Sequence, residues 1–511
     1  MIEYKTIIGG DHRYLSELTE FKNGLPDGVI NKVKTDVGGT YIAANCDKNY
    51  IIVCPYRDLV NSIYEDANNK YNIFKCYTGI YKSDFVKYCK NNKIKKIAVT
   101  YDSLESKLLK WLNNTTEEWY VVIDEYHTIL SDMDYRENAI NRLMSVLSKF
   151  KHLSLLSATP INATFEPKCI AKLPHYRVEW NNMEKVEVIR FKTSNIHYGL
   201  CKLINLFLTT GLFVGDVRVE QLFIFFNSVT GIKEILEELD LDPDLVKISC
   251  ASKIDNKRKL GDTYQIESTT APNKAINFFT KKGFQGCNLF TNNGLIIVVS
   301  DSTKESSVID ISTALEQISG RIRDNKEYHN IFRNKILHFY NTNSKLLSDD
   351  EFNDLMAIKD KEGQILIDGF KQLSADAQQI YSARLNLNND VVSIINNKMV
   401  YNELKRNSFI YKQELKKQYK DGFTVAASYN SKKFTPIKQE YWNNLYKKVN
   451  KLISKNYKES LIEYLSNKDE SDLKEHPEFE EYTRYLSTKE MSSLQYSKSK
   501  LTKAVENKKK L

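Results

Sequence analysis

The sequence predicts an α/β protein with two doubly wound parallel-sheet lobes, followed by a mainly α-helical C-terminal region. Short runs that are apolar on both faces alternate with helical patterns, first between residues 50 and 159 and again between 221 and 340. Such runs are typical of buried parallel strands. The strand pattern fades after about residue 343, and 511 residues are too many for one hydrophobic core.

The first lobe is predicted at residues 1–175. Its strands are apolar runs bounded by turn residues, which begin at Ile51, Lys96, Tyr120 and Leu153. Helical patterns such as 57–68 and 135–150 lie between these runs. Because crossover helices cover both faces of a parallel sheet, we expect the chemistry at the carboxyl ends of the strands.

The second lobe is predicted at residues 176–343, and the region 344–511 is predicted to be a helical, basic domain. The strands of the second lobe are again apolar runs, which begin at Gln221, Val246, Gly294 and Asn334. The segments 167–183 and 187–192 are expected to join the two lobes.

The composition is that of an ordinary globular protein, with 41% hydrophobic and 27% charged residues. No apolar stretch approaches the ~20 residues that a membrane span needs, and the N-terminus shows no signal-peptide pattern. The eight cysteines are scattered without a CxxC pair, which suits reduced thiols. We therefore expect a cytoplasmic protein with no membrane partner.

The net charge of +9 is concentrated at one end of the chain. Residues 391–511 hold 25 Lys and Arg against 15 Asp and Glu, which leaves 49 against 50 for the rest. This excess predicts a polyanion partner. Between 398 and 458 aromatic residues are interleaved with the lysines, a combination suited to single-stranded nucleic acid. The alternative is a helical domain whose aromatics form its core and whose lysines are solvated.

An acidic pair, Asp124 and Glu125, ends the apolar run that begins at Tyr120. Carboxylates at the carboxyl end of a parallel sheet can take part in nucleotide hydrolysis. Asp124 can hold Mg²⁺ through water, and Glu125 can orient and deprotonate an attacking water. The alternative is a strand followed by a solvated acidic turn.

Two further motifs follow in order. Ser157 and Thr159 end another apolar run and can hydrogen-bond toward the acidic motif, with His127 coupling the two. In the second lobe the stretch 317–323 reads QISGRIR, so that Gln317, Arg321 and Arg323 lie in or near one helix. The guanidinium groups of Arg321 and Arg323 can stabilise charge that develops on a γ-phosphate.

These motifs, DEYH, SATP and QISGRIR, resemble motifs II, III and VI of superfamily 2 DExH-type helicases. The resemblance covers roughly residues 35–323 and implies two RecA-like lobes that sandwich ATP. Weaker matches imply contacts with the nucleic-acid backbone, for which ordinary turn chemistry at strand ends is the alternative. The residues concerned are Arg57, Thr100, Tyr101, Ser228 and Gly286.

The phosphate loop departs from the family pattern. The family expects Gly-Lys-Thr, whereas residues 38–40 read Gly-Gly-Thr. Thr40 occupies the Mg²⁺-binding position, Gly38 permits the tight turn, and Gly39 replaces the lysine, with Thr35 earlier in the loop. Our hypothesis is that Lys34 supplies the missing cation. The alternative is that Lys34 is a surface charge and that ATP binds weakly or not at all.

Two other residues depart from the expected pattern. Asp36 places a carboxylate in a loop that should bind phosphate, so it must face away or meet the metal. Arg323 follows Arg321 by two residues instead of three. On a helix this spacing shifts the second guanidinium by about 100°, which favours Arg321.

The sequence therefore predicts a nucleic-acid-stimulated ATPase, a helicase or translocase that uses ATP and Mg²⁺ and acts on DNA or RNA, with DNA favoured. The GGT loop with DEYH and GFQGCN is also similar to helicases of large tailed bacteriophages, with crAss-like phages as one candidate source. That similarity implies replication or transcription proteins as partners and the host cytoplasm as the location. Two alternatives stay open: a terminase-like DNA packaging motor, and a nucleic-acid-binding scaffold that has lost hydrolysis.

Overall fold

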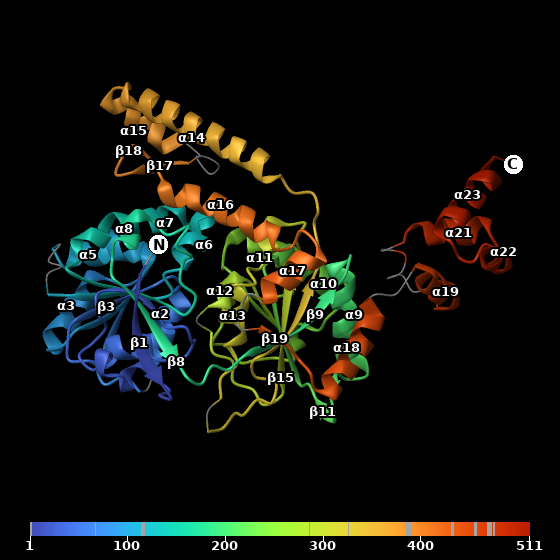
Figure 1. The fold of residues 1–511 in the computed structure, drawn as a ribbon, viewed down its shortest axis with the longest axis horizontal. Coiled ribbons are helices and arrows are strands. Elements are labelled where there is room, and N and C mark those ends of the chain that lie inside the picture. The colour runs from blue at the N-terminus through green and yellow to red at the C-terminus, as the bar shows by residue number, and fades with distance from the viewer. Residues whose placement is uncertain are drawn as a thin grey trace.

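The computed structural model describes residues 3–66, 68–113, 118–285, 287–324, 326–384, 391–430, 434–453, 457–467, 473 and 476–510. Within these residues two lobes, each built on a parallel sheet, lie side by side (Figure 1). Helical segments follow them in the chain, so the predicted fold class is confirmed. No described helix has the length and apolar character that crossing a membrane requires.

The first lobe contains an eight-stranded sheet in the order β1-β8-β2-β7-β6-β3-β5-β4. All of its strand pairs are parallel. The strands are β1 Tyr4–Gly10, β2 Gly28–Asn31, β3 Tyr50–Cys54, β4 Ile73–Cys76, β5 Lys96–Thr100, β6 Tyr120–Ile123, β7 His152–Ser157 and β8 His175–Trp180. The helices are α1 Gly39–Asn45, α2 Arg57–Glu65, α3 Lys82–Asn91, α4 Tyr101–Ser103, α5 Leu109–Trp111, α6 Thr128–Ser131, α7 Met133–Val146 and α8 Lys168–Ala171.

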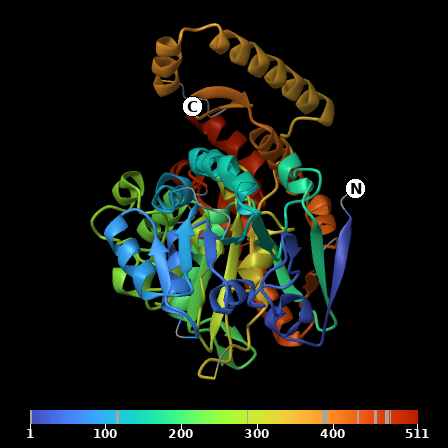
Figure 2. The same ribbon diagram turned by 90° about the vertical axis from the view of Figure 1, so that its left-hand side faces the viewer.

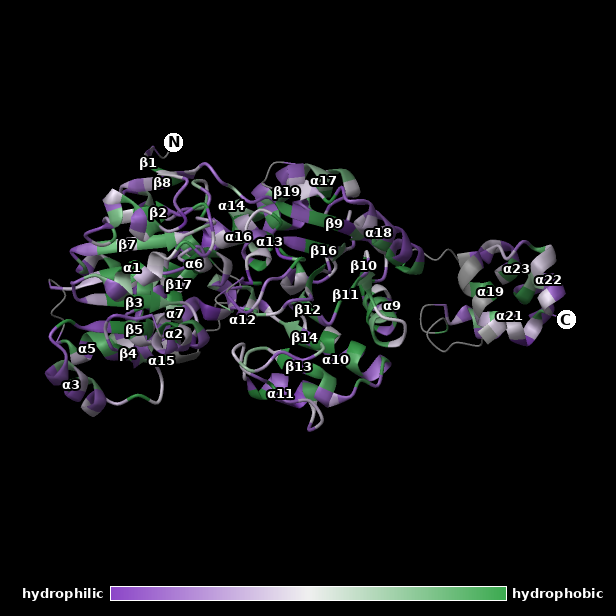
Figure 3. Ribbon diagram, turned by 90° about the horizontal axis from the view of Figure 1, so that it is seen from below, coloured by the Kyte–Doolittle hydropathy of each residue, from purple (hydrophilic) through white to green (hydrophobic). Residues whose placement is uncertain are grey.

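Both faces of this sheet are buried, as its continuous apolar runs predict. In β6, Val121 and Ile123 pack into one hydrophobic cluster, while Val122 packs into the cluster on the opposite face. Helix α7 adds Ile140 to the first cluster, and α1 adds Ala43 to the second. In Figure 3 the strands of both lobes are largely hydrophobic. This packing fixes the carboxyl ends of β2, β6 and β7, which lie next to one another in the sheet.

The second lobe contains a seven-stranded sheet in the order β13-β14-β12-β15-β16-β9-β19. Its strands are β9 Val186–Lys192, β12 Gln221–Phe226, β13 Val246–Ser249, β14 Ile276–Phe279, β15 Gly294–Ser300, β16 Lys335–Tyr340 and β19 Phe434–Pro436. Its helices are α9 Ile196–Thr209, α10 Val229–Glu238, α11 Ile254–Leu260, α12 Lys281–Phe284 and α13 Ala314–Ser319. A short hairpin, β10 Phe213–Val214 with β11 Val217–Arg218, follows α9.

The second lobe does not close at residue 343, where the sequence places its boundary. Strand β19 pairs with β9 and extends the sheet. Helix α18, Glu440–Ile453, buries Trp442 and Leu445 in the core of this lobe. Strand β19 and helix α18 therefore complete the second lobe. Strand β19 pairs with the edge strand β9, and α18 packs in the same hydrophobic core as α9.

The chain between these parts crosses over both lobes. It forms α14 Asp349–Lys371, α15 Ala375–Arg384, the hairpin β17 Val392–Ile395 with β18 Lys398–Tyr401, α16 Glu403–Lys417 and α17 Gly422–Asn430. Helix α16 runs from the first lobe to the second, and α14 lies beyond it (Figures 1 and 2). Asn402 caps the start of α16 by accepting a hydrogen bond from the backbone N–H of Lys405.

The C-terminal helices form a separate group with its own hydrophobic core (Figure 3). They are α19 Tyr457–Asn467, α21 Glu478–Tyr485, α22 Thr488–Ser493 and α23 Lys498–Lys509. Phe479, Tyr482 and Leu501 are buried in this core. The region predicted as one C-terminal domain therefore divides into a crossing segment, a part of the second lobe and this helical group.

Candidate active site between the lobes

The acidic pair lies at the end of β6, at the edge of the first sheet that faces the second lobe. The backbone N–H of Asp124 donates to the carbonyl of Val53 in the neighbouring strand, which fixes its position. Glu125 has a φ of 48°, in the left-handed region that few residues other than glycine adopt. Unusual backbone of this kind clusters at functional sites.

A lysine that the sequence analysis did not single out meets this pair. The Nζ of Lys32 lies 3.5 Å from Glu125 Oε1 and 3.9 Å from Asp124 Oδ1. Only 7% of Lys32 is exposed. It directly follows β2, which is separated from β6 only by β7. The sequence gives some indication of Lys32, because it is the first cation after an apolar run. Lys34 lies two residues later and is indicated equally well, so the pattern does not choose between them.

The charges in this cluster shift one another's pKa values. Burial raises the pKa of Asp124 to about 6, with Lys32 acting in the opposite direction. Burial also acts to raise the pKa of Glu125, but Lys32, His127 and Arg321 outweigh it and lower that pKa. Burial acts to lower the pKa of Lys32, yet the two carboxylates outweigh it and raise that pKa. Glu125 and Lys32 are therefore both charged at neutral pH.

The structure turns Lys34 away from the acidic pair. Its Nζ lies 4.9 Å from the ring centroid of Trp180, at the end of β8. Burial lowers its pKa, while the charge of Glu184 acts in the other direction. Lys32, and not Lys34, therefore has its ammonium beside Asp124 and Glu125.

The loop between β2 and α1 is held by tight turns. Val33 has a φ of 63°, and the backbone N–H of Lys34 donates to the carbonyl of Lys32 over 2.7 Å. Gly38, with a φ of 78°, is the N-cap of α1. A side chain at that backbone angle would be strained, so glycine is favoured there. Thr40 lies in the first turn of α1, as the expected metal-binding position does.

The second lobe touches this loop directly. A Cβ built on Gly320 would lie 2.4 Å from the Oγ1 of Thr35, so the two segments are in close contact. Asp36 forms an ion pair with Arg323, with 3.2 Å between Oδ2 and Nη1. The carboxylate of Asp36 therefore faces an arginine of the other lobe, which explains how the phosphate loop tolerates it.

The two arginines follow α13 and do not lie in it, contrary to the helix expected for residues 317–323, and they occupy different environments. Arg321 is buried, and its Nε donates to the carbonyl of Gln317 over 2.7 Å. Arg323 donates from Nε to Asn288 Oδ1 over 3.2 Å. Burial, and then the charge of Arg321, lower the pKa of Arg323 to about 10. Arg321 is the one whose charge reaches Glu125.

Hydrogen bonds join the acidic motif to both lobes. Gln317 donates from Nε2 to Glu125 Oε2 over 3.4 Å and to Thr159 Oγ1 over 3.1 Å. His127 Nδ1 lies 2.8 Å from Ser157 Oγ and 3.3 Å from Glu125 Oε2. On its other side, His127 Nε2 lies 2.9 Å from the Nε2 of Gln285, in the second lobe.

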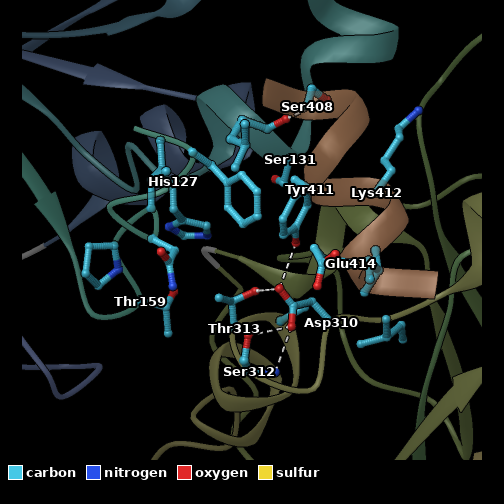
Figure 4. Close-up of a pocket in the computed structure, with 18 of the residues that line it drawn as sticks. His127, Ser131, Thr159, Asp310, Ser312, Thr313, Ser408, Tyr411, Lys412 and Glu414 are labelled. Atoms are coloured by element: carbon cyan, nitrogen blue, oxygen red, sulfur yellow. Dashed lines mark hydrogen bonds between the residues drawn. The ribbon is translucent and has the colours of Figure 1, made fainter. Parts of the chain in front are cut away.

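A cavity of about 1310 Å³ opens beside this network. His127 and Thr159 line it from the first lobe, and Asp310 lines it from the second. Helix α16 lines it with Tyr411 and Lys412 (Figure 4). Tyr411 points across the cavity and donates to Asp310 Oδ2 over 2.8 Å.

The residues at the carboxyl end of β6 fit a magnesium ion. The Oδ1 of Asp124 is buried and has no hydrogen-bond partner among the described residues. A buried, unpaired oxygen is unfavourable, and a bound cation would satisfy it. No group of three or more His, Cys, Asp or Glu side chains in the described part of the chain is arranged to hold a metal. Mg²⁺ needs no such group, because it keeps several waters and binds through one or two protein oxygens and phosphate.

The residues expected to contact nucleic acid lie in varied positions. Arg57 is exposed at the start of α2, with its Cζ 4.1 Å from the ring centroid of Tyr77. Thr100 is buried and donates to Ser103 Oγ over 3.1 Å. Ser228 caps α10 by accepting a hydrogen bond from the backbone N–H of Gly231. Gly286 lies outside the described residues.

Tyr101 does not lie where a nucleic-acid contact requires it. Its side chain is completely buried, and its hydroxyl donates to the carbonyl of Asp124 over 3.2 Å. Its ring packs into the hydrophobic core of the first lobe. For a tyrosine that directly follows a buried strand, this core packing takes the place of a contact with nucleic acid. Among the later aromatics, Tyr419 and Trp442 are also buried, whereas Phe423 is 84% exposed.

Comparisons with known proteins find similarity to helicases. Residues 30–166 match the family model described as DEAD/DEAH box helicase. Mss116p bound to ssRNA and AMP-PNP matches at 13% identity over 81% of this chain and 89% of that chain, with a TM-score of 0.40. S. cerevisiae Dbp5 bound to RNA and ADP BeF3 matches at 13% identity over 66% and 83% of the two chains, with a TM-score of 0.39. Mycobacterium smegmatis helicase Lhr bound to ssDNA and AMP-PNP matches at 12% identity over 61% and 44%, also at 0.39.

No protein with a curated description matches the chain. The family match spans the segment from the end of β2 to beyond β7, and therefore includes Lys32, the phosphate loop, the acidic pair and the SATP motif. The first lobe is thus similar to a DEAD/DEAH box helicase domain.

Proposed function

We propose that the protein is a nucleic-acid-stimulated ATPase, a helicase or translocase that hydrolyses ATP between its two lobes. One observation carries the proposal: Glu125 of the first lobe receives a hydrogen bond from Gln317 of the second, and the charge of Arg321 reaches it. Because residues of both lobes meet at one carboxylate, hydrolysis and lobe movement can depend on each other.

The residues have the following proposed roles. Glu125 is charged at neutral pH and accepts a proton from the water that attacks the γ-phosphate. Asp124 and Thr40 hold Mg²⁺, which neutralises charge on the phosphate oxygens. Arg321 stabilises the charge that develops on the γ-phosphate, with Arg323 as the second arginine. Thr35, Gly38 and Gly39 form the phosphate loop.

Coupling to nucleic acid is proposed through His127, Ser157 and Thr159. These side chains lie between the acidic motif and the second lobe, which is what a relay between nucleotide and nucleic acid requires. Arg57, Ser228 and Gly286 remain the proposed backbone contacts, and Thr100 and Tyr101 leave this set because both side chains are buried.

DNA is proposed ahead of RNA as the substrate, in replication or transcription of a phage genome. The support is the similarity of the DEYH, GGT and GFQGCN segments to phage helicases, whereas the basic excess in residues 391–511 supports a nucleic-acid partner of either kind. Phosphate contacts alone do not distinguish the two nucleic acids, since the 2′-hydroxyl is what a protein reads to tell them apart.

The experiment is ATP turnover by the full chain with Mg²⁺, alone and with single-stranded or duplex DNA or RNA, followed by strand separation on a partial duplex. The proposal expects turnover that rises at least about tenfold with one of the nucleic acids. Nucleic-acid binding without any turnover would support the scaffold alternative, which Gly39 favours. Metal-dependent cleavage of DNA would support the packaging motor.

A further inference from the structure

We infer that Lys32, which directly follows β2, does the work of the lysine that is missing at position 39: it binds the phosphates of the nucleotide. The inference rests on the proposed function and adds to it the residue that supplies the cation. Three features of the structure carry it: the space that Gly39 leaves, the rigid backbone around Lys32, and the contacts of its ammonium group.

The side chain of Lys32 uses the space that Gly39 leaves. A Cβ built on Gly39 would lie 3.4 Å from the Cδ of Lys32 and 2.9 Å from Leu156 Cδ1. The stem of Lys32 therefore passes over the first residue of α1, close to where a lysine at position 39 would begin. The glycine and the lysine are a matched pair, because a side chain extending from position 39 would share this space with the stem of Lys32 and would also press on Leu156.

The backbone of Lys32 is fixed on both sides. Its N–H donates to the carbonyl of Ser157 over 2.9 Å, and its carbonyl accepts from Trp180 Nε1 over 2.8 Å and from the N–H of Lys34. The last bond closes a tight turn centred on Val33, a β-branched residue at a φ of 63°. A backbone this unfavourable persists only where its surroundings over-determine it. The turn sends Lys32 toward the acidic pair and Lys34 toward Trp180.

The ammonium of Lys32 lies beside the two carboxylates that the proposed function assigns to nucleotide chemistry. It is 3.5 Å from Glu125 Oε1 and 3.9 Å from Asp124 Oδ1. These distances are longer than strong hydrogen bonds, so the group can turn its three N–H donors toward phosphate oxygens when a nucleotide enters. A lysine is a compact charge on a flexible stem, which suits this movement.

The test measures binding of a fluorescent ATP analogue with Mg²⁺, together with ATP turnover, in the full chain and five variants. Lys32→Met removes the charge and keeps the stem, and Lys32→Arg keeps a cation. Lys34→Met is the matched comparison, and Gly39→Lys is made both alone and with Lys32→Ala. Thermal unfolding of each variant identifies any that is not folded.

We expect Lys32→Met to weaken nucleotide binding at least about tenfold and turnover about a hundredfold or more. Lys34→Met should stay within about twofold of wild type. Gly39→Lys should have opposite effects in the two backgrounds. Beside Lys32 it should weaken binding, because the two stems share one space and their like charges repel. With Lys32→Ala it should restore binding, because a lysine again reaches the phosphates.

The inference is overturned if Lys34→Met loses binding while Lys32→Met keeps it, or if Gly39→Lys strengthens binding beside an intact Lys32. The Gly39→Lys comparison decides the matter even if Lys32→Met does not fold. If the wild type binds the analogue but does not hydrolyse ATP, only the proposed function is contradicted. The role of Lys32 is then decided by comparing analogue binding in wild type and the variants. A wild type that binds no nucleotide overturns both.

Discussion

Gln317 in the second lobe donates a hydrogen bond to Thr159 in the first, with 3.1 Å between Nε2 and Oγ1. The same amide reaches Glu125 Oε2 at 3.4 Å. Gln317 has no exposed surface. One buried side chain therefore links the acidic motif and the SATP motif to helix α13, which ends just before the two arginines. Its bonds to the first lobe can exist only while the lobes are closed on each other.

Replacing Gln317 with Ala should reduce the stimulation of ATP turnover by nucleic acid more than it reduces nucleotide binding. The reason is that Gln317 touches the relay between the lobes and not the phosphate loop. We expect stimulation to fall about tenfold, within the range of allosteric coupling energies. Turnover with and without nucleic acid measures this. The control is Gln372→Ala, at an exposed position after α14. If both variants lost the same amount of stimulation, Gln317 would not act in coupling the lobes.

Arg321 and Arg323 should differ when each is replaced with Lys. Arg321 is buried and donates to the carbonyl of Gln317 in the preceding helix α13, so a lysine cannot reproduce its position. We expect Arg321→Lys to lower turnover about a thousandfold, as loss of an arginine that stabilises a γ-phosphate does. Arg323→Lys can keep its ion pair with Asp36 and should lower turnover less. The opposite ranking in steady-state assays would assign the role to Arg323.

Helix α16 should act as a clasp between the lobes. Lys412 forms ion pairs with Asp134 of the first lobe and Glu305 of the second, and Tyr411 bonds Asp310. Lys412→Met should let the lobes separate, because both ion pairs are lost from a partly buried position. The distance between fluorophores on the two lobes should increase in the absence of nucleotide.

The matched control for this clasp is Lys420→Met, an exposed residue beyond the end of α16. Tyr411→Phe should lower the free energy of unfolding by about 1 kcal/mol, the ordinary value of one lost hydrogen bond. An interlobe distance that stays the same in Lys412→Met would show that α16 does not hold the lobes together.

His338 should make the protein lose stability as the pH falls. Burial, and then the charge of Arg190, lower its pKa from 6.5 to about 3. The unfolded chain therefore takes up a proton below pH 6.5 that the folded chain refuses, so the stability contributed by the neutral ring is lost from pH 6.5 down to about 3. Between pH 7 and 5 this residue should lower the free energy of unfolding by about 2 kcal/mol.

His338→Gln measures this contribution, since it keeps a polar group near Ser300, which lies 2.8 Å from the ring, and does not titrate. Urea unfolding at several pH values should give a flatter pH dependence for the variant than for wild type. Parallel curves would contradict the assignment, whatever the absolute stability of the variant.

The sequence could predict the strands that are buried on both faces, because such strands are continuous apolar runs. The run that begins at Tyr120 became β6. It could not predict β19, which has three residues and includes Pro436. That strand forms only because the edge of the second sheet at β9 is available to it, and this is a tertiary property that no local pattern carries.

The candidate site was predictable as a set of motifs but not as a set of contacts. The order of the acidic pair, SATP and the arginine helix was enough to bring Glu125 and Gln317 into one hypothesis. Spacing could not choose between Lys32 and Lys34, because the choice depends on the positive φ of Val33. A β-branched residue gives no local signal for that backbone angle.

The most direct test of the account is ATP turnover by Glu125→Gln compared with wild type, with Mg²⁺ and a stimulating nucleic acid. The substitution keeps the size of the side chain and one acceptor oxygen, and it removes the negative charge and the base. Glu179→Gln, an exposed residue of β8, is the control. The account predicts that Glu125→Gln loses at least about a hundredfold in turnover and still binds the nucleotide. Turnover equal to wild type in Glu125→Gln would contradict it.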